Sequence, residues 1–377
     1  MSADAAPVQA TGTRRRPSLR LLWMLPAGLC LLGGLDAALL LLGLPAPISV
    51  SRLAETHGML LVLGFVATLI SLERATALRR WYGYAAPALL GLAGLLMLFD
   101  AVPLLVAKIA LIAGTAALTL LYIPLWLRRY DAQLLVQMLA AGLGLAAAIL
   151  WTAGTAMPLI TPWLLCFLVL TIAAERVELA SIAMGPRAGT RLLVHACLVV
   201  VALLILLANA QIGAIALGAA LLALVVWLVR HDVARRTIHA AGATRFMAAC
   251  MLGGYFWLAV AGATLLFGFP ASQRAYDTVT HAVLLGFVMS MIMAHATTIL
   301  PAILHISLPY RAAFWAPAAL LHASLVVRIW IGDGLGVPLA FTLGGAMGVA
   351  ALLLFVLTAL GSAIAGPPKR GAKAPDA

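Results

Sequence analysis

The sequence predicts an all-α, polytopic membrane protein with about twelve transmembrane helices. Of the 377 residues, 64% are hydrophobic and only 10% are charged, and the mean hydropathy is +1.11. Long apolar runs recur along nearly the whole chain, and the basic residues fall between them in a regular alternation. A soluble domain cannot bury so much apolar surface, so these observations exclude a soluble enzyme or binding module.

The apolar runs define one transmembrane domain over residues 20–361. The flanking segments 1–19 and 362–377 are small and polar, and we expect them to be disordered cytoplasmic tails, the first of them basic. Each run can cross the bilayer as a helix, with some tilt where it is short. In chain order the predicted spans are Leu21–Leu44, His57–Leu72, Tyr84–Phe99, Val102–Leu127, Leu134–Gly154, Pro162–Ala174, Leu192–Ala208, Ile212–Val229, Phe246–Gly268, Val279–Leu300, Ala312–Ile331 and Val337–Leu360.

The basic residues predict the orientation of the chain. With alternating loops, twenty Lys and Arg residues fall on one side, whereas only Arg52 and Arg274 fall on the other. Cytoplasmic loops are enriched in Lys and Arg, so both termini are expected in the cytoplasm, in a protein of the bacterial inner membrane. A wrong number of helices would destroy this alternation. The net charge of +12 is thereby explained by topology, with the lipid bilayer as partner and no nucleic acid.

His57 and His281 open the second and tenth predicted spans in nearly the same local sequence. Each follows a threonine, and each is followed within two turns by a Gly-Phe-Val triplet, which begins at Gly64 or Gly286. Both spans run inward from the outer surface, so the two imidazoles match in depth to within one helical turn, ~5 Å. Imidazole is a common axial ligand of haem iron. The pair therefore predicts one haem b, and the glycines would let a flat macrocycle approach the backbone.

Three further residues extend this prediction. Arg328 lies near the outer end of the eleventh span, where a guanidinium would suit the haem propionates. His295 follows His281 by fourteen residues, which places it on the same helix face ~21 Å further in. With His195, at the inner end of the seventh span, it forms a candidate second metal or haem site. The alternative is that all four histidines are structural, and bond to neighbouring polar groups.

A weak internal repeat links three of the spans. The second ends in Glu73-Arg74, the sixth ends in Glu175-Arg176, and the tenth carries His295 at the corresponding position. The spacing of four helices predicts three pseudo-equivalent groups of four.

At this point the chain resembles haem–copper oxidase subunit I and the related NnrS-type membrane haem proteins. The likeness rests on the number of spans, their fourfold period, and single histidines that open the second and tenth. It implies that His57 and His281 are the axial ligands of a low-spin haem near the outer surface. The oxidase position for the high-spin haem ligand is Val279, and the sixth span offers Pro162 instead of a histidine. A copper site is therefore not expected, and neither is a terminal oxidase.

Three classes of function remain open from the sequence. The first is a b-type haem protein that transfers electrons with a redox partner, or that binds a diatomic gas such as nitric oxide. The second is a secondary transporter of a small solute, for which twelve spans are common. The third is a non-catalytic scaffold subunit. We expect the first.

Overall fold

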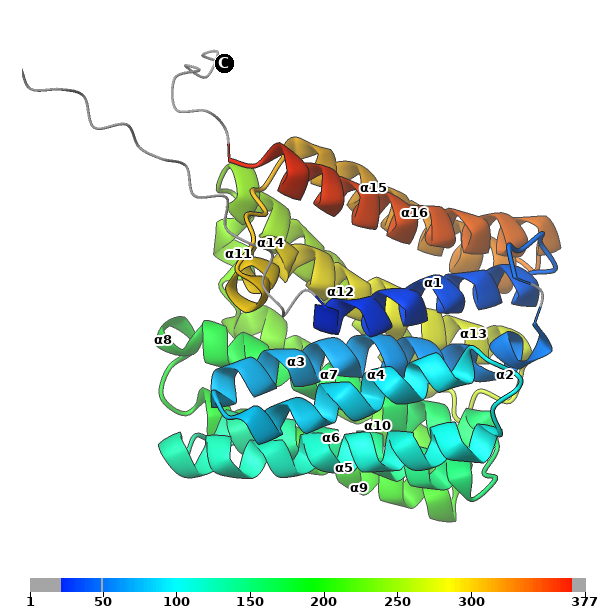
Figure 1. Ribbon diagram of the computed structural model, residues 1–377, viewed down its shortest axis with the longest axis horizontal. Helices are drawn as coiled ribbons and strands as arrows, with labels where there is room; N and C mark the ends of the chain where they lie inside the picture. The colour runs from blue at the N-terminus through cyan, green and yellow to red at the C-terminus, as the bar shows by residue number, and fades with distance from the viewer. Residues whose placement is uncertain (1–21, 49, 368–377) are drawn as a thin grey trace, which may run out of the picture.

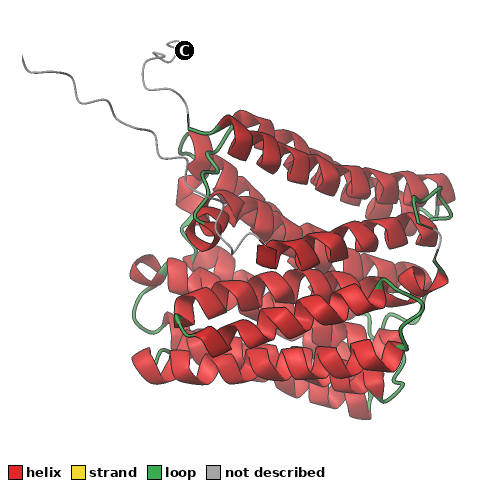
Figure 2. Ribbon diagram, in the orientation of Figure 1, coloured by secondary structure: helices red, strands yellow, loops and turns green. Residues whose placement is uncertain are grey.

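A computed structural model describes residues 22–48 and 50–367 of the chain. Within these ranges the protein is built of helices and loops, without a strand (Figure 2). Eleven of the described helices are long and apolar enough to cross a membrane, and a shorter apolar segment, Trp81–Met97, lies where the third span was predicted. The prediction of an all-α polytopic membrane protein is confirmed. The predicted tail 1–19 and residues 368–377 of the second tail lie outside the described residues.

The first half of the chain contains six spans, two of them composite. Its elements are α1 (Met24–Leu41), α2 (Ser51–Met59), the π-helix η2 (Leu60–Val66), α3 (Ala67–Leu78), the 3₁₀ turn η3 (Trp81–Tyr84), α4 (Ala85–Met97), α5 (Leu104–Arg129), α6 (Ala132–Thr152), α7 (Met157–Leu179) and α8 (Ser181–Met184).

The second half contains the other six spans, and its tenth and eleventh spans are composite. Its elements are α9 (Ala188–Ala208), α10 (Ala210–His231), α11 (Ala234–Thr237), α12 (Gly242–Leu265), α13 (Gln273–His281), the π-helix η4 (Ala282–Met289), α14 (Ser290–Leu304), the 3₁₀ turn η5 (Ala312–Phe314), α15 (Trp315–Leu325), the π-helix η6 (Val326–Gly334) and α16 (Pro338–Ala365). The last of these extends four residues into the segment predicted as the second tail.

The long helices lie side by side along one axis, so the bundle has two ends (Figure 1). We call the end formed by α2 and α13 the histidine end, since these helices carry His57 and His281. The opposite end carries α8, α11 and the last described residues, and we call it the basic end. Every composite span runs from one end to the other without a break.

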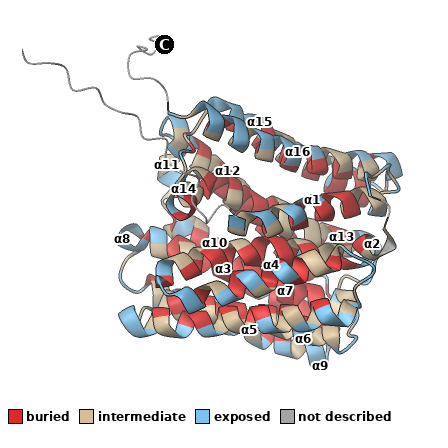
Figure 3. Cartoon of the chain, in the orientation of Figure 1, coloured by how far each residue is buried: buried red, intermediate tan, exposed pale blue. Residues whose placement is uncertain are grey.

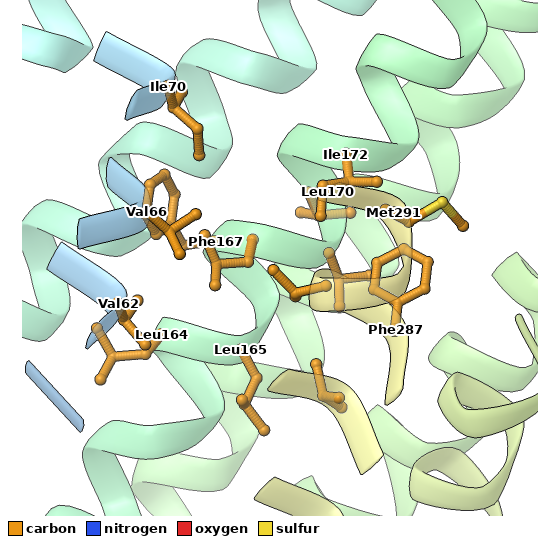
Figure 4. Close-up of a cluster of buried hydrophobic side chains, with 14 of the residues drawn as sticks. Val62, Val66, Ile70, Leu164, Leu165, Phe167, Leu170, Ile172, Phe287 and Met291 are labelled. Carbon is orange, nitrogen blue, oxygen red and sulfur yellow. The ribbon is translucent and has the colours of Figure 1, made fainter. Parts of the chain in front are cut away.

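The second, sixth and tenth spans pack together at the centre of the bundle. In Figure 4, side chains of the second span such as Val66 face Phe167 on α7, and Phe287 of the tenth span lies beyond α7. Residues 157–174 of α7 carry no charged side chain and are apolar on all sides, which is the pattern of a helix with no solvent or lipid face. Accordingly, 83% of its most apolar window is buried. The three repeat-related spans therefore form the core.

The outer helices cover this core, and many of their residues are exposed (Figure 3). Helix α9 is the clearest case, because it exposes an apolar side chain every three or four residues. These residues are Val194, Leu198, Val201, Leu204 and Leu207. A continuous exposed apolar stripe of this length fits a lipid-facing helix.

Close packing in the core depends on Gly286. A Cβ built on this glycine would overlap the Cβ and ring of Trp257 on α12. We expect Gly286→Ala to lower the free energy of unfolding by about 1–3 kcal/mol, because neither helix backbone can move freely. The matched control is Gly142→Ala on α6, where an added Cβ meets nothing within 4 Å. The stability of both variants is measured by thermal unfolding in detergent. Equal stability of Gly286→Ala and Gly142→Ala would contradict this expectation.

Candidate functional site

The helices that carry His57 and His281 begin earlier than hydropathy indicates. The second span starts at Arg52 and the tenth at Gln273, so each histidine lies more than a turn inside its helix. The extra turn is polar in both. The side chain of Ser272 caps the tenth span by accepting from the amide of Ala275, at 3.2 Å.

A π-helical segment follows each histidine within three residues, η2 after His57 and η4 after His281. A third, η6, contains Arg328. Such segments are rare and short in proteins, and they occur frequently at functional sites. Sequence analysis placed His57, His281 and Arg328 near the outer surface. In the structure each of these residues lies in a π-helix or within three residues of one.

The ring of His57 is held by α1. Its Nδ1 lies 3.0 Å from the carbonyl oxygen of Gly34. A carbonyl oxygen can only accept, so Nδ1 carries the proton and donates it, and Nε2 bears the free lone pair. The ring is half-buried, and no described residue hydrogen-bonds to its Nε2.

The ring of His281 is held in the same way by its own helix. Its Nδ1 lies 3.0 Å from Oδ1 of Asp277 and 3.1 Å from the Asp277 carbonyl oxygen. Both partners are acceptors, so Nδ1 is again the donor, and no described residue hydrogen-bonds to Nε2. The side chain is 20% exposed. Both imidazoles therefore make the Nδ1–H hydrogen bond to an oxygen that generally orients histidine ligands of metals.

Asp277 is fixed in turn by Arg328. The guanidinium donates from Nε to Oδ2 at 2.8 Å and from Nη2 to Oδ1 at 2.7 Å, which is a bidentate pair. Both side chains are nearly buried, at 11% and 5% exposure, and the guanidinium lies over the ring of Phe341. Sequence analysis assigned Arg328 to haem propionates, whereas in the structure two of its nitrogens bind Asp277.

The structure brings these groups together at the histidine end. His57 lies within electrostatic range of His281, Asp277 and Arg328. The acidic side chain of Asp333 also borders the cluster, where it accepts a hydrogen bond from Thr278 at 3.2 Å. The donor set available to a cofactor is the pair of free Nε2 atoms.

Gly64 and Gly286, which were expected to let a macrocycle approach the backbone, have a different role in the structure. The Cα of Gly64 packs against Cys30 of α1 and Gly94 of α4, where a Cβ would lie 3.1–3.2 Å from their nearest atoms. Gly286 packs against Trp257 of α12. Protein atoms fill the space beside both glycines, so they permit close helix packing and do not form an open surface for a macrocycle.

The proposed second site is not assembled in the structure. Both ring nitrogens of His295 are occupied, Nε2 by Nη1 of Arg176 at 2.9 Å and Nδ1 by the carbonyl oxygen of Met291 at 2.8 Å. His195 binds the carbonyl oxygen of Arg191 and stacks on Trp227. Within the described part of the chain, no group of three or more His, Cys, Asp or Glu side chains is placed to hold a metal ion.

His295 belongs instead to a buried network at the basic end. Arg176 makes a bidentate pair with Asp232, at 3.0 Å for both hydrogen bonds, and the hydroxyl of Tyr255 donates to the same carboxylate at 2.6 Å. The Asp232 side chain has 0% exposure. Burial alone would raise the pKa of Asp232, but the hydrogen bonds and charge of Arg176 outweigh it and hold the pKa below its usual value.

A second buried network lies beside the first. Arg74 is surrounded by three carboxylates: it forms a short ion pair with Glu73, and lies 3.2 Å from Glu178 and 3.8 Å from Glu175. The hydroxyl of the buried Tyr122 has no hydrogen-bond partner among the described residues. Sequence analysis did not single out these networks as sites.

The internal repeat was the signal that could have located them. The Glu-Arg pairs that end the second and sixth spans, and His295 in the tenth, are the residues that meet here. Arg74 reaches Glu175 of the second pair, and Arg176 reaches His295. The repeat places these residues at equivalent positions of the second, sixth and tenth spans. Because these spans pack together, the residues meet at the basic end.

Comparison with known proteins gives one result. A family model described as a domain of unknown function, DUF8744, matches residues 20–364. The chain belongs to this family. Searches of curated proteins and of solved structures found no match. The DUF8744 match begins before α1 and ends within α16, so the histidine end and both basic-end networks lie inside the family's domain.

Proposed function

We propose that this protein is a membrane b-type haem protein in which His57 and His281 are the two axial ligands. One observation carries the proposal: two imidazoles at the same end of the bundle each donate from Nδ1 to a fixed oxygen, and no described residue hydrogen-bonds to either Nε2. A metal-bound histidine generally has such a hydrogen bond, because the oxygen that accepts from Nδ1 fixes the tautomer and the orientation of the ring.

The residues that anchor the two histidines support ligation by both rings. Asp277 orients His281, and Arg328 neutralises Asp277, so the carboxylate does not leave a buried charge next to the ligand. The resemblance to NnrS-type proteins and to oxidase subunit I supports the same two ligands. When bound, haem would supply one-electron or gas-binding chemistry, and the chain would supply ligation, orientation and a low-dielectric setting.

Electron transfer is the activity that this arrangement favours over gas binding. Gas binding requires one axial position to open. Here each imidazole is anchored through Nδ1 to an oxygen, on α1 for His57 and on its own helix for His281. Two ligands that are both held in place favour a six-coordinate iron that cycles between oxidation states, with a redox partner as donor or acceptor.

The orientation we propose follows from the basic residues. Thirteen of the described Lys and Arg residues, from Arg74 to Arg311, lie in the helix ends and loops of the basic end, which is therefore cytoplasmic, with the histidine end outside in the bacterial inner membrane. The buried charged side chains of the described chain lie towards the two ends of the bundle. A secondary transporter generally places its ion and substrate sites near the midplane, so this distribution favours the haem protein.

An absorption spectrum tests the proposal. The protein is purified from haem-replete cells, alongside His57→Ala, His281→Ala and the matched control His195→Ala. We expect a Soret band and a sharp reduced α-band in the wild type and in His195→Ala, and loss or strong broadening of both bands in the other two. A colourless but folded wild-type protein would contradict the proposal.

A further inference from the structure

A polar pocket opens at the basic end, where α10 passes into α11. Four of its lining residues are basic: Arg230, His231, Arg235 and Arg236. Its cavity volume is about 280 Å³. A liquid water occupies ~30 Å³, so this space would admit several waters or one phosphate group.

The arginines of this pocket have no anionic partner. Arg230, Arg235 and Arg236 are exposed, and no described residue accepts a hydrogen bond from their side chains or pairs with them. Elsewhere at this end the buried Arg176 is paired with Asp232. Three guanidinium groups around one cavity form a positive site that the described part of the chain does not neutralise.

The one acidic residue in the lining does not change this. Asp232 directs both carboxylate oxygens away from the arginines of the pocket, to Arg176 and to the hydroxyl of Tyr255, and it also accepts from the amide of Ala234. Its charge is thus compensated from inside the bundle. It also fixes the start of α11, which carries Arg235 and Arg236.

We propose that this pocket binds the phosphate group of an anionic ligand. Guanidinium groups form planar, paired hydrogen bonds to phosphate oxygens, and basic pockets beside transmembrane helices are suited to anionic headgroups. The neighbouring helix α8 reaches the pocket through Ala183, and beside it Ile182 and Leu179 are 99% and 62% exposed. These apolar side chains favour a membrane lipid as the source of the phosphate, with its acyl chains against α8.

The test compares the full-length protein in nanodiscs of three kinds. The first contain phosphatidylcholine alone, the second phosphatidylcholine and phosphatidylglycerol in equal parts, and the third phosphatidylcholine with inorganic phosphate in the buffer. The readouts are the unfolding temperature and, by native mass spectrometry, the number of retained phosphatidylglycerol molecules. The variant is Arg235→Gln with Arg236→Gln. The matched control is Arg79→Gln with Arg80→Gln, two exposed arginines that follow α3 at the same end.

We expect phosphatidylglycerol to raise the unfolding temperature of the wild type and of the control. The pocket variant loses charge-assisted hydrogen bonds to phosphate. Its affinity for phosphatidylglycerol should therefore fall by about tenfold or more. An equal effect of inorganic phosphate would identify a soluble phosphate compound as the source. Equal unfolding temperatures of variant and wild type in phosphatidylcholine alone would show that the variant folds. The proposal is overturned if neither probe distinguishes the pocket variant from the wild type, or if the control loses as much.

Discussion

Replacing Arg328 with methionine is expected to destabilise the protein by about 3–5 kcal/mol, because it leaves a buried carboxylate without its counter-charge. Asp277 is 5% exposed and takes both of its strongest hydrogen bonds from this arginine. The measurement is thermal or denaturant unfolding of the detergent-solubilised protein.

A double variant provides the control for this prediction. With Arg328→Met and Asp277→Leu together, neither charge is left unpaired, and replacing a buried ion pair with apolar residues is often neutral. Most of the lost stability should therefore return. His281 would keep the Asp277 main-chain carbonyl but lose the carboxylate, so its haem spectrum should change even though the fold recovers. Equal stability of the single and double variants would show that the ion pair does not hold this end together.

Replacing Arg176 with methionine is expected to cost a similar ~3–5 kcal/mol at the basic end. Asp232 would lose its bidentate partner, and His295 would lose the donor to its Nε2. Arg187→Met is the matched control, because this arginine is exposed at the same end and a surface substitution changes stability by less than ~0.5 kcal/mol. A stable Arg176→Met protein would contradict the role we give to this network.

The same network predicts a pH dependence. The folded pKa of Asp232 is lower than its unfolded value of ~3.9, so its contribution to stability is complete above about pH 4. As the pH falls through the depressed folded pKa, the carboxylate is protonated and the contribution is lost. The stability difference between wild type and Arg176→Met should therefore narrow in acid. A difference that stays constant from neutral pH to pH ~3 would oppose this reading.

The sequence predicted the fold class and the positions of the spans because hydropathy is a local property that each apolar run carries by itself. Tyr84–Phe99 was predicted as a span, and the helical segment Trp81–Met97 lies at that place. Helix starts were predicted less well. Ser51 and Gln273 begin helices whose first turns are polar, and hydropathy does not distinguish a polar helical turn from a loop.

The pairing of buried charges was beyond local sequence patterns. Asp277 and Arg328 are 51 residues apart, and Arg176 and Asp232 are 56 apart, so only the packed fold brings them together. The π-helices after His57 and His281 were also not foreseen, since they arise from a shift in backbone hydrogen bonding that no residue type encodes. The shared depth of the two histidines was the useful signal, because membrane topology fixes depth before tertiary contacts are known.

The most direct test of our central proposal is the axial ligation of iron in the purified protein, read by electron paramagnetic resonance and near-infrared magnetic circular dichroism. We predict one low-spin haem per chain with two nitrogen axial ligands, and its conversion to a high-spin form by either His57→Ala or His281→Ala. A low-spin signal that persists when both histidines are replaced would contradict it, as would folded protein that takes up no haem.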